Sequence, residues 1–175
     1  MNGGCKTFGF DDGPKELGLQ RKILTVELVP STSWGDNLRS RLSKKDWDTL
    51  RKLQYERANH RCEICGGVGW KQGYKWPVEC HEVWEYDDAN GIQRLARLIA
   101  LCPFCHKAKH LGRAEVMGEM KLVLAHLMAV NEWTREETLA HTGAAFTLWK
   151  ERSKRAWTLD ISILPGVGLL SSPTE

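Results

Sequence analysis

Four of the six cysteines lie in two Cys-x-x-Cys pairs, Cys62/Cys65 and Cys102/Cys105. Such a loop lets two thiolates converge on one ion, and two loops supply the four soft ligands of a tetrahedral zinc site. Disulfides would fit a secreted chain, and a redox dithiol would fit a thioredoxin-like pattern that this sequence lacks. The spacing therefore predicts one structural Zn2+ ion bound by all four cysteines.

Histidines stand beside the second pair, in LCPFCHKAKH at 101–110. His106 and His110 are four residues apart, so on a helix that starts near Cys105 they share a face and can chelate a second ion. Surface histidines without a ligand are commoner, but His81 is expected on a strand that the zinc would draw towards this segment. A divalent ion can stabilise charge on a scissile phosphate while a neutral imidazole takes a proton from water. The three histidines therefore favour metal-assisted cleavage of a phosphodiester.

Strands and a helix must bring these residues together. RKILTVELVP predicts a strand that ends at Pro30, and Ser43 opens a helix expected over 44–59. YKWPVECHEVWEY is typical of one or two strands broken at Pro77, and DDANG is typical of a turn. GIQRLARLIALC fits either a helix or an extended segment. The middle of the chain therefore predicts strands that lead into the second cysteine pair.

The C-terminal third predicts two helices, over 114–130 and 135–155. Thr134 and Glu137 form a capping box, in which each side chain accepts a free N–H group of the first helical turn. WTLDISIL, near the C-terminus, is typical of a strand. We expect these elements to pack around the cysteine and histidine sites.

Composition places the chain among globular proteins, with 175 residues, 42% hydrophobic residues and a net charge of +3. The apolar runs are far shorter than the roughly 20 residues that span a bilayer, and the N-terminus lacks a basic and then apolar leader, so we expect no membrane partner and a cytoplasmic location. Basic residues concentrate over 38–61 and 150–155, which indicates either solvated helix faces or contacts to a polyanion. Cys5 is expected to be unpaired.

The motifs CEICGG, ECHEVWEYDD and LIALCPFCHKAKH together resemble the zinc-stabilised HNH endonucleases of the ββα-metal superfamily. The flanking sequence, from residue 26 to Ser162, is similar to a bacterial and phage branch of that family. This resemblance implies hydrolysis of DNA phosphodiester bonds with one catalytic divalent ion such as Mg2+, Mn2+ or Ni2+. By position it makes His81 the general base, His106 the metal-binding histidine and His110 a further ligand.

Two positions depart from the family pattern. Cys80 stands where many members carry an acidic or histidine ligand, and a thiol suits magnesium poorly. Glu79 or Glu82 is a candidate replacement, and Glu82 is the candidate metal ligand, although adjacent strand residues face opposite ways. Arg97 stands where the motif has its asparagine, so we expect the amide to come from elsewhere. Asn90 and Gln93 are the candidates for that amide, and Cys80 is expected to be a buried thiol.

Basic and aromatic residues near the motif are candidates for nucleic-acid contact. Lysine and arginine neutralise phosphate without reading sequence, so Arg97, Lys107 and Lys109 are expected at the DNA backbone. Most of the tryptophans are expected in the core, whereas Trp70 and Trp76, close to glycine-rich turns, could instead stack on a base. His60, His126 and His141 are expected to have no ligand role.

We therefore expect an α+β protein built on a zinc-braced ββα-metal (HNH) nuclease module with a flanking N-terminal strand and helix and a C-terminal helical pair. The expected boundaries are a flexible leader over 1–20, the strand and helix over 21–59, the nuclease module over 60–112, and the helical pair, strand and tail over 113–175. The alternative is a zinc module that binds nucleic acid or a protein partner without cleaving, and a third is a structural zinc domain of a larger assembly.

Overall fold

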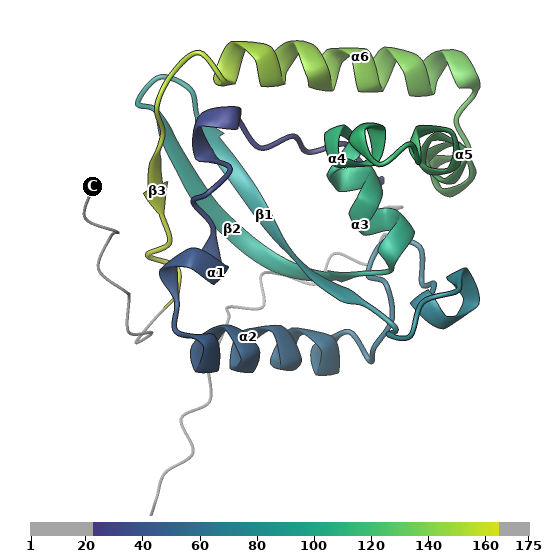
Figure 1. Ribbon diagram of the computed structural model, residues 1–175, viewed down its shortest axis with the longest axis horizontal. Helices are drawn as coiled ribbons and strands as arrows, with labels where there is room; N and C mark the ends of the chain where they lie inside the picture. Colours follow the sequence, from purple (N-terminus) through teal and green to yellow (C-terminus); the bar gives the residue numbers. More distant parts are fainter. Residues whose placement is uncertain (1–22, 165–175) are drawn as a thin grey trace, which may run out of the picture.

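The computed structural model describes residues 23–164 and shows an α+β fold (Figure 1). A long β-hairpin runs through the middle, with α6 along one side of it and α2 along the other, while α3, α4 and α5 gather at one end. The elements are η1 (Ser31–Ser33), α1 (Leu38–Arg41), α2 (Lys44–Arg57), η2 (Gly69–Gln72), β1 (Glu79–Asp87), β2 (Ile92–Leu101), α3 (Pro103–Lys109), α4 (Leu111–Val116), α5 (Met120–Asn131), α6 (Arg135–Arg152) and β3 (Thr158–Asp160).

The sheet has three strands in the order β1-β2-β3. β1 and β2 pair antiparallel, and β3 adds to β2 in parallel. The DDANG turn is confirmed: the Asp87 carboxylate accepts the backbone N–H groups of Ala89 and Asn90, and Gly91 has a φ of 67° that favours glycine. The segment that fitted either a helix or a strand is therefore the central strand, and it leads directly into α3.

The two faces of β1 look into different environments. Glu79 and His81 face α3, where they contact its histidines. Cys80 and Trp84 pack instead against the cluster formed with α1 and α2. Because side chains alternate along a strand, the hairpin divides the molecule into two cores.

The larger core lies between β2, the two cysteine pairs and the helices α3, α4 and α5. Its buried members include Cys62, Cys102 and Cys105 together with apolar side chains of α5 such as Val123 and Leu127. Three of the four thiols that could bind a metal ion are thus part of the same packed interior that holds the helices, whereas Cys65 is exposed. The second core contains Leu38, Leu42, Trp47, Leu50, Leu95, Ile161 and Leu164.

The predicted N-terminal strand is wrong for the described residues 23–30, which have no regular secondary structure. Their backbone groups bond to helices instead of to a sheet. The Asn131 side chain binds both the N–H and the C=O of Leu24 at 2.8 Å, and the N–H of Val26 donates to His141 Nε2 at 2.9 Å. The apolar side chains of the segment still reach the core, with Leu24 and Val26 buried. The expected leader over 1–20 and Cys5 lie outside the described residues.

The helix predictions are confirmed with one correction. α2 covers most of 44–59, and α6 begins after Thr134 with the capping box in place. The helix expected over 114–130 is divided into α4 and α5, because Gly118 has a φ of 72° that ends one helix before the next begins. β3 covers only three residues of the expected C-terminal strand. No helix within residues 23–164 is long and apolar enough to cross a membrane.

Candidate metal centres

The sulfur atoms of Cys62, Cys65, Cys102 and Cys105 lie within 4.8 Å of one another. The Cys65 and Cys102 sulfurs are 3.6 Å apart. A zinc ion with bonds of about 2.3 Å places its sulfur ligands about 3.8 Å apart in a tetrahedron, so these four thiols could hold zinc with little movement. None of them forms a disulfide. The cysteine spacing therefore identified a convergent site.

Backbone turns shape each half of this site. In the first pair, the N–H of Gly66 donates to the carbonyl of Cys62 at 2.9 Å, and Gly66 has the left-handed φ of 70° that this turn needs. In the second pair, Cys102 occupies the N-cap position of α3 and Pro103 lies in its first turn. A proline there loses no helical hydrogen bond, and the free N–H groups of the first turn favour nearby thiolates.

Two side chains that the sequence analysis did not assign to the site contact its sulfurs. Gln72 Nε2 donates to Cys102 Sγ at 3.2 Å, and His126 Nε2 lies 3.2 Å from Cys105 Sγ. Hydrogen bonds of this kind hold metal ligands in orientation. His126 comes from α5, and no sequence spacing relates it to the cysteine pairs, so only the packing of α5 on α3 shows the contact.

A second convergent group is formed by His81 on β1, His106 on α3, and His110 where α3 meets α4. Their rings lie 4.8 to 5.4 Å apart between centroids, and one nitrogen of each lies within 4.8 Å of the others. His106 follows Cys105 directly in the chain, so the two centres share α3. The fold therefore brings together the three histidines that the sequence analysis singled out, as a group that could hold a metal ion.

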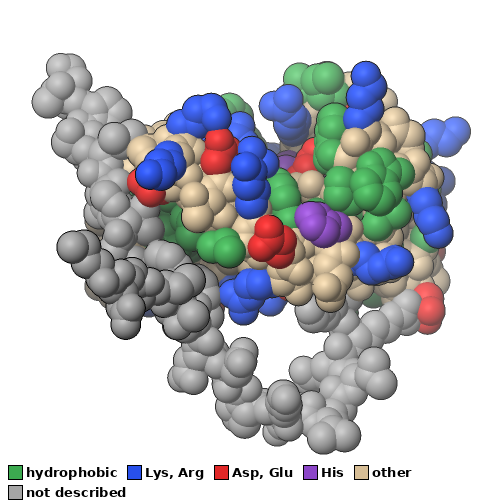
Figure 2. Space-filling model, turned by 90° about the horizontal axis from the view of Figure 1, so that it is seen from below, with side chains coloured by type: hydrophobic (Ala, Val, Ile, Leu, Met, Phe, Trp, Pro, Cys, Tyr) green, Lys and Arg blue, Asp and Glu red, His purple; other side chains and the backbone are tan. Residues whose placement is uncertain are grey.

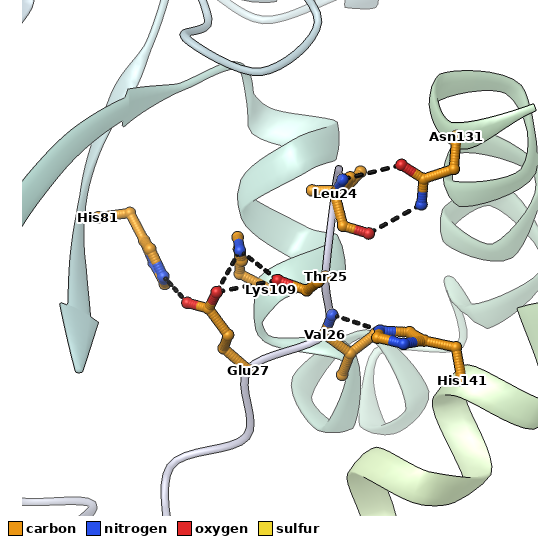
Figure 3. A network of polar contacts seen from close by, with 8 residues as sticks. All are labelled: Leu24, Thr25, Val26, Glu27, His81, Lys109, Asn131 and His141. Atoms are coloured by element: carbon orange, nitrogen blue, oxygen red, sulfur yellow. Dashed lines mark hydrogen bonds and ion pairs between the residues drawn. The ribbon is translucent and has the colours of Figure 1, made fainter. Parts of the chain in front are cut away.

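Carboxylates hold two of these three rings. Glu79 accepts a hydrogen bond from His106 Nδ1, which leaves Nε2 of that ring free for a ligand. Glu27 accepts from His81 Nε2 at 3.2 Å, as Figure 3 shows. His81 Nδ1 is buried and has no hydrogen-bond partner among the described residues. A carboxylate on one ring nitrogen is the usual device by which proteins fix the tautomer of a metal-binding or proton-accepting histidine.

At the histidine group, Glu27 is the residue that sequence reasoning missed. It comes from the irregular segment before η1, 54 residues from His81 in the chain. Its other carboxylate oxygen forms an ion pair with Lys109, which also donates to Thr25 Oγ1 at 2.8 Å (Figure 3). Burial would raise the pKa of Glu27, but the hydrogen bond from His81 and the charge of Lys109 outweigh burial and lower it to about 2. The carboxylate is therefore ionised at neutral pH.

Burial also shapes the titration of the histidines. Burial lowers the pKa of His81 to about 4, against the opposing hydrogen bond to Glu27. Burial and the neighbouring charge of His106 lower the pKa of His110 well below its usual value. Both rings are consequently neutral at pH 7, which is the form that binds metal ions or accepts protons.

The structure corrects the expectation for Glu82. Its side chain lies on the far face of the sheet from the histidines, where Oε1 accepts the backbone N–H of Leu38 at 3.1 Å. Burial raises the pKa of Glu82 to about 7. Cys80 shares that face and is partly buried against the second core, so it is no ligand of this group. Of the two glutamates near His81 in the chain, Glu79 is the one that lies beside the histidine group.

The candidates for the missing amide are also misplaced. Asn90 belongs to the hairpin turn, where its Nδ2 donates to Asp87 at 2.7 Å. Gln93 pairs with Tyr86 near that turn, whereas His81 pairs with Ile99 towards the other end of the hairpin. Neither amide reaches the histidines, because the strand register holds both at the opposite end.

The three basic residues expected at DNA differ in placement. Lys109 is wrong for such a contact, because it is only 3% exposed and is paired with Glu27. Lys107 pairs with Glu119 and lies 5.4 Å from the centre of the Tyr74 ring. Arg97 is exposed, and its partner across the hairpin is Val83, two residues from His81. Of the three, Arg97 is the best placed to meet a phosphate near the histidines.

Basic side chains are spread over the surface seen in Figure 2. Lysine and arginine side chains occupy several parts of this face, with acidic side chains among them. The exposed basic side chains of α2 include Lys45 and Lys52, which form no ion pair with another residue of the described range 23–164. Such scattered positive charge supports weak contacts with a polyanion and gives no sequence readout.

Comparison of the chain with protein-family models, with curated proteins and with solved structures finds no match.

Proposed function

We propose that this chain is a metal-dependent endonuclease of the HNH type that hydrolyses DNA phosphodiester bonds. The observation that carries the proposal is the convergence of His81, His106 and His110 beside the four cysteines, with a carboxylate on two of the three rings. The order of two antiparallel strands followed by α3 supports the ββα arrangement that the motif resemblance implies. Zinc at the cysteines would brace this arrangement, and a divalent ion at the histidines would supply Lewis acidity.

Each residue then has a physical task. His106 and His110 would hold the catalytic ion, with Glu79 orienting the ring of His106 through Nδ1. His81 takes a proton from the attacking water at Nδ1, because Nε2 is held by the ionised Glu27. The negative carboxylate stabilises the imidazolium that forms on proton transfer. Glu27 thereby supplies, from outside the motif, the carboxylate that contacts His81.

Plasmid nicking tests the proposal. Zinc-loaded wild-type protein is incubated with supercoiled plasmid and Mg2+, Mn2+ or Ni2+, and the nicked and linear forms are followed with time. His81→Ala should lose about 10² to 10⁴-fold in rate because proton abstraction is lost. His106→Ala should lose cleavage because the ion is lost. The cleavage rate of His110→Ala should lie between those of His106→Ala and the wild type, since water can replace one ligand.

Metal titration separates the roles of the histidines. Calorimetry on zinc-loaded protein should show weaker binding of the second ion in His106→Ala than in His81→Ala, with one zinc per chain retained in both. His60→Ala is the matched control, because His60 is exposed at the end of α2 and outside the histidine group. If the wild type binds no second ion with DNA present and nicks no plasmid, the endonuclease proposal is wrong.

A second candidate function is a zinc module that binds nucleic acid or protein without cleaving. The burial of His81, which is 3% exposed, favours it, because a general base must reach water. In that case His81 is a third ligand of a structural ion, or a buried partner of Glu27. Binding of DNA that weakens steeply with salt, without nicking under any divalent ion, would identify this module.

A further inference from the structure

The loop between the first cysteine pair and β1 exposes two indole rings. Trp70 is 61% exposed and Trp76 is 43% exposed. Both indole N–H groups already have partners within the protein, Lys75 O for Trp70 at 3.3 Å and Glu79 Oε1 for Trp76 at 2.9 Å. What these rings can still offer a ligand is therefore an apolar π surface, which suits stacking.

The loop holds these rings in place. The N–H of Gly69 donates to Pro77 O at 2.7 Å, and the N–H of Tyr74 returns to Gly69 O at 3.0 Å. A side chain at Gly69 would lie 2.1 Å from the carbonyl oxygen of Trp76, so the backbone closes tightly there. Gln72 ties the loop to Cys102 Sγ and to the N–H of Phe104 at 3.2 Å each. A ligand that stacks on this loop would meet an ordered surface and would bear little entropic cost.

Charge and position indicate the kind of ligand. Lys71 follows Trp70 and Lys75 precedes Trp76, and both lysines are exposed and have no ion pair among the described residues. Trp76 is linked through Glu79 to His106, so one edge of the loop borders the histidine group. Exposed aromatic rings, each with a lysine next to it in the chain, form a surface that suits a strand with unpaired bases and a charged backbone.

We propose that residues 70–76 form a binding surface for single-stranded nucleic acid, on which Trp70 and Trp76 stack on unpaired bases and Lys71 and Lys75 contact phosphates. This inference deepens the proposed function and rests on it: if the chain is an endonuclease, its preferred substrate carries unpaired bases next to the bond that is cleaved. In an intact duplex the bases are already stacked and their faces are closed to the indoles. The surface therefore discriminates by strand structure and does not read base sequence.

Binding measured without cleavage tests the surface. Zinc-loaded protein with no added divalent ion is titrated into a fluorescein-labelled 12-nucleotide single strand of mixed sequence, and separately into its blunt duplex, with fluorescence anisotropy as the readout. Trp70→Ala and Trp76→Ala should each weaken single-strand binding about tenfold and leave duplex binding within about twofold. Trp76→Phe keeps a stacking ring without the indole N–H, so it should retain most of the affinity.

Trp34→Ala is the matched control. Trp34 is 66% exposed and its indole N–H is bound to Val29 O at 2.9 Å, but it stacks on Trp149 of α6, away from the loop. It should bind both probes like the wild type. Zinc content and melting temperature of each variant establish that the fold is retained.

The outcomes distinguish this inference from the endonuclease proposal. Tryptophan-dependent single-strand binding upholds the surface even if the wild type nicks no plasmid. Unchanged single-strand binding in folded Trp70→Ala and Trp76→Ala overturns it, and so does an equal loss for single strand and duplex. Failure of Trp76→Phe to retain affinity assigns the effect to the Glu79 contact and overturns the stacking role.

Discussion

Replacing Glu27 by glutamine tests how the segment before η1 supports the histidine group. The substitution keeps the size of the side chain and removes its negative charge. Two buried groups depend on that charge: the Lys109 side chain, 4% exposed, and the His81 side chain, 3% exposed. No other carboxylate pairs with Lys109 among the described residues. The variant therefore leaves a buried ammonium group without its counter-charge.

The expected loss of stability follows from the same contacts. The pKa of Glu27 falls from 4.5 to about 2, which corresponds to about 3 kcal/mol at pH 7. Because the folded-state pKa is lowered, this contribution is present above the unfolded value and is lost as the pH falls towards 2. The Glu27 side chain is 33% exposed, so solvent screening reduces the figure. Breaking a buried ion pair costs about 3 to 5 kcal/mol, so we expect about 2 kcal/mol for this half-buried pair.

Urea denaturation of the zinc-loaded protein at pH 7, followed by circular dichroism, measures this loss. Glu115→Gln is the control, because Glu115 is exposed on α4 and pairs with no cation in the part of the chain that the structure describes. Lys109→Met and the double variant complete a cycle. The double variant should be more stable than the sum of the single losses predicts, because it buries no unpaired charge.

Metal binding gives an independent readout of the same substitution. Loss of a carboxylate that orients a ligand or base typically costs about 10 to 100-fold in metal affinity or activity. Glu27→Gln should therefore weaken the second ion or slow nicking while zinc remains at one per chain. A loss below about 0.5 kcal/mol, additive with Lys109→Met and without effect on the second ion, would refute the reasoning.

Three further outcomes are expected. Cys102→Ser should release the structural zinc and abolish cooperative melting, because metal binding can supply about 10 kcal/mol or more to a small module; unchanged melting with bound zinc would contradict the four-cysteine site. Gly69→Ala should destabilise by about 1 to 3 kcal/mol, seen as a lower melting temperature, because its Cβ would meet the carbonyl of Trp76 at 2.1 Å. Asn131→Ala should cost about 2 kcal/mol by the same assay, since both side-chain hydrogen bonds to the backbone of buried Leu24 are lost.

Local spacing was enough to identify several features. The two Cys-x-x-Cys pairs indicated a four-thiol site because short loops force neighbouring thiols together wherever the chain runs. The capping box at Thr134 indicated the start of α6, since its hydrogen bonds lie within one helical turn. His106 and His110 were placed on one side by helical periodicity alone.

The sequence did not decide whether residues 92–101 form a helix or a strand, because an apolar stretch with charges at irregular intervals fits both the helical and the strand period. Pairing with β1 decides it, and a bulge between Val83 and Trp84 absorbs the irregular spacing. The N-terminal segment has branched residues typical of a strand, yet its backbone partners are Asn131, His141 and Lys109. Strand propensity describes a residue's fit to a pleated surface, and tertiary contacts determine whether such a surface is there.

The chemistry of the histidine group depended most on the tertiary structure. Alternation along a strand places Glu79 on the face of His81 and Glu82 on the other face, but only the fold shows that the first face meets His106 and the second meets Leu38. The sequence predicted Lys109 to be a surface cation, but Lys109 is buried. Its burial is possible because Glu27, 82 residues away in the chain, pairs with it. Residue types and short spacings thus determined which side chains could bind metal, whereas contacts between distant segments decided which carboxylates orient them, because a buried charge needs a partner that only folding brings within reach.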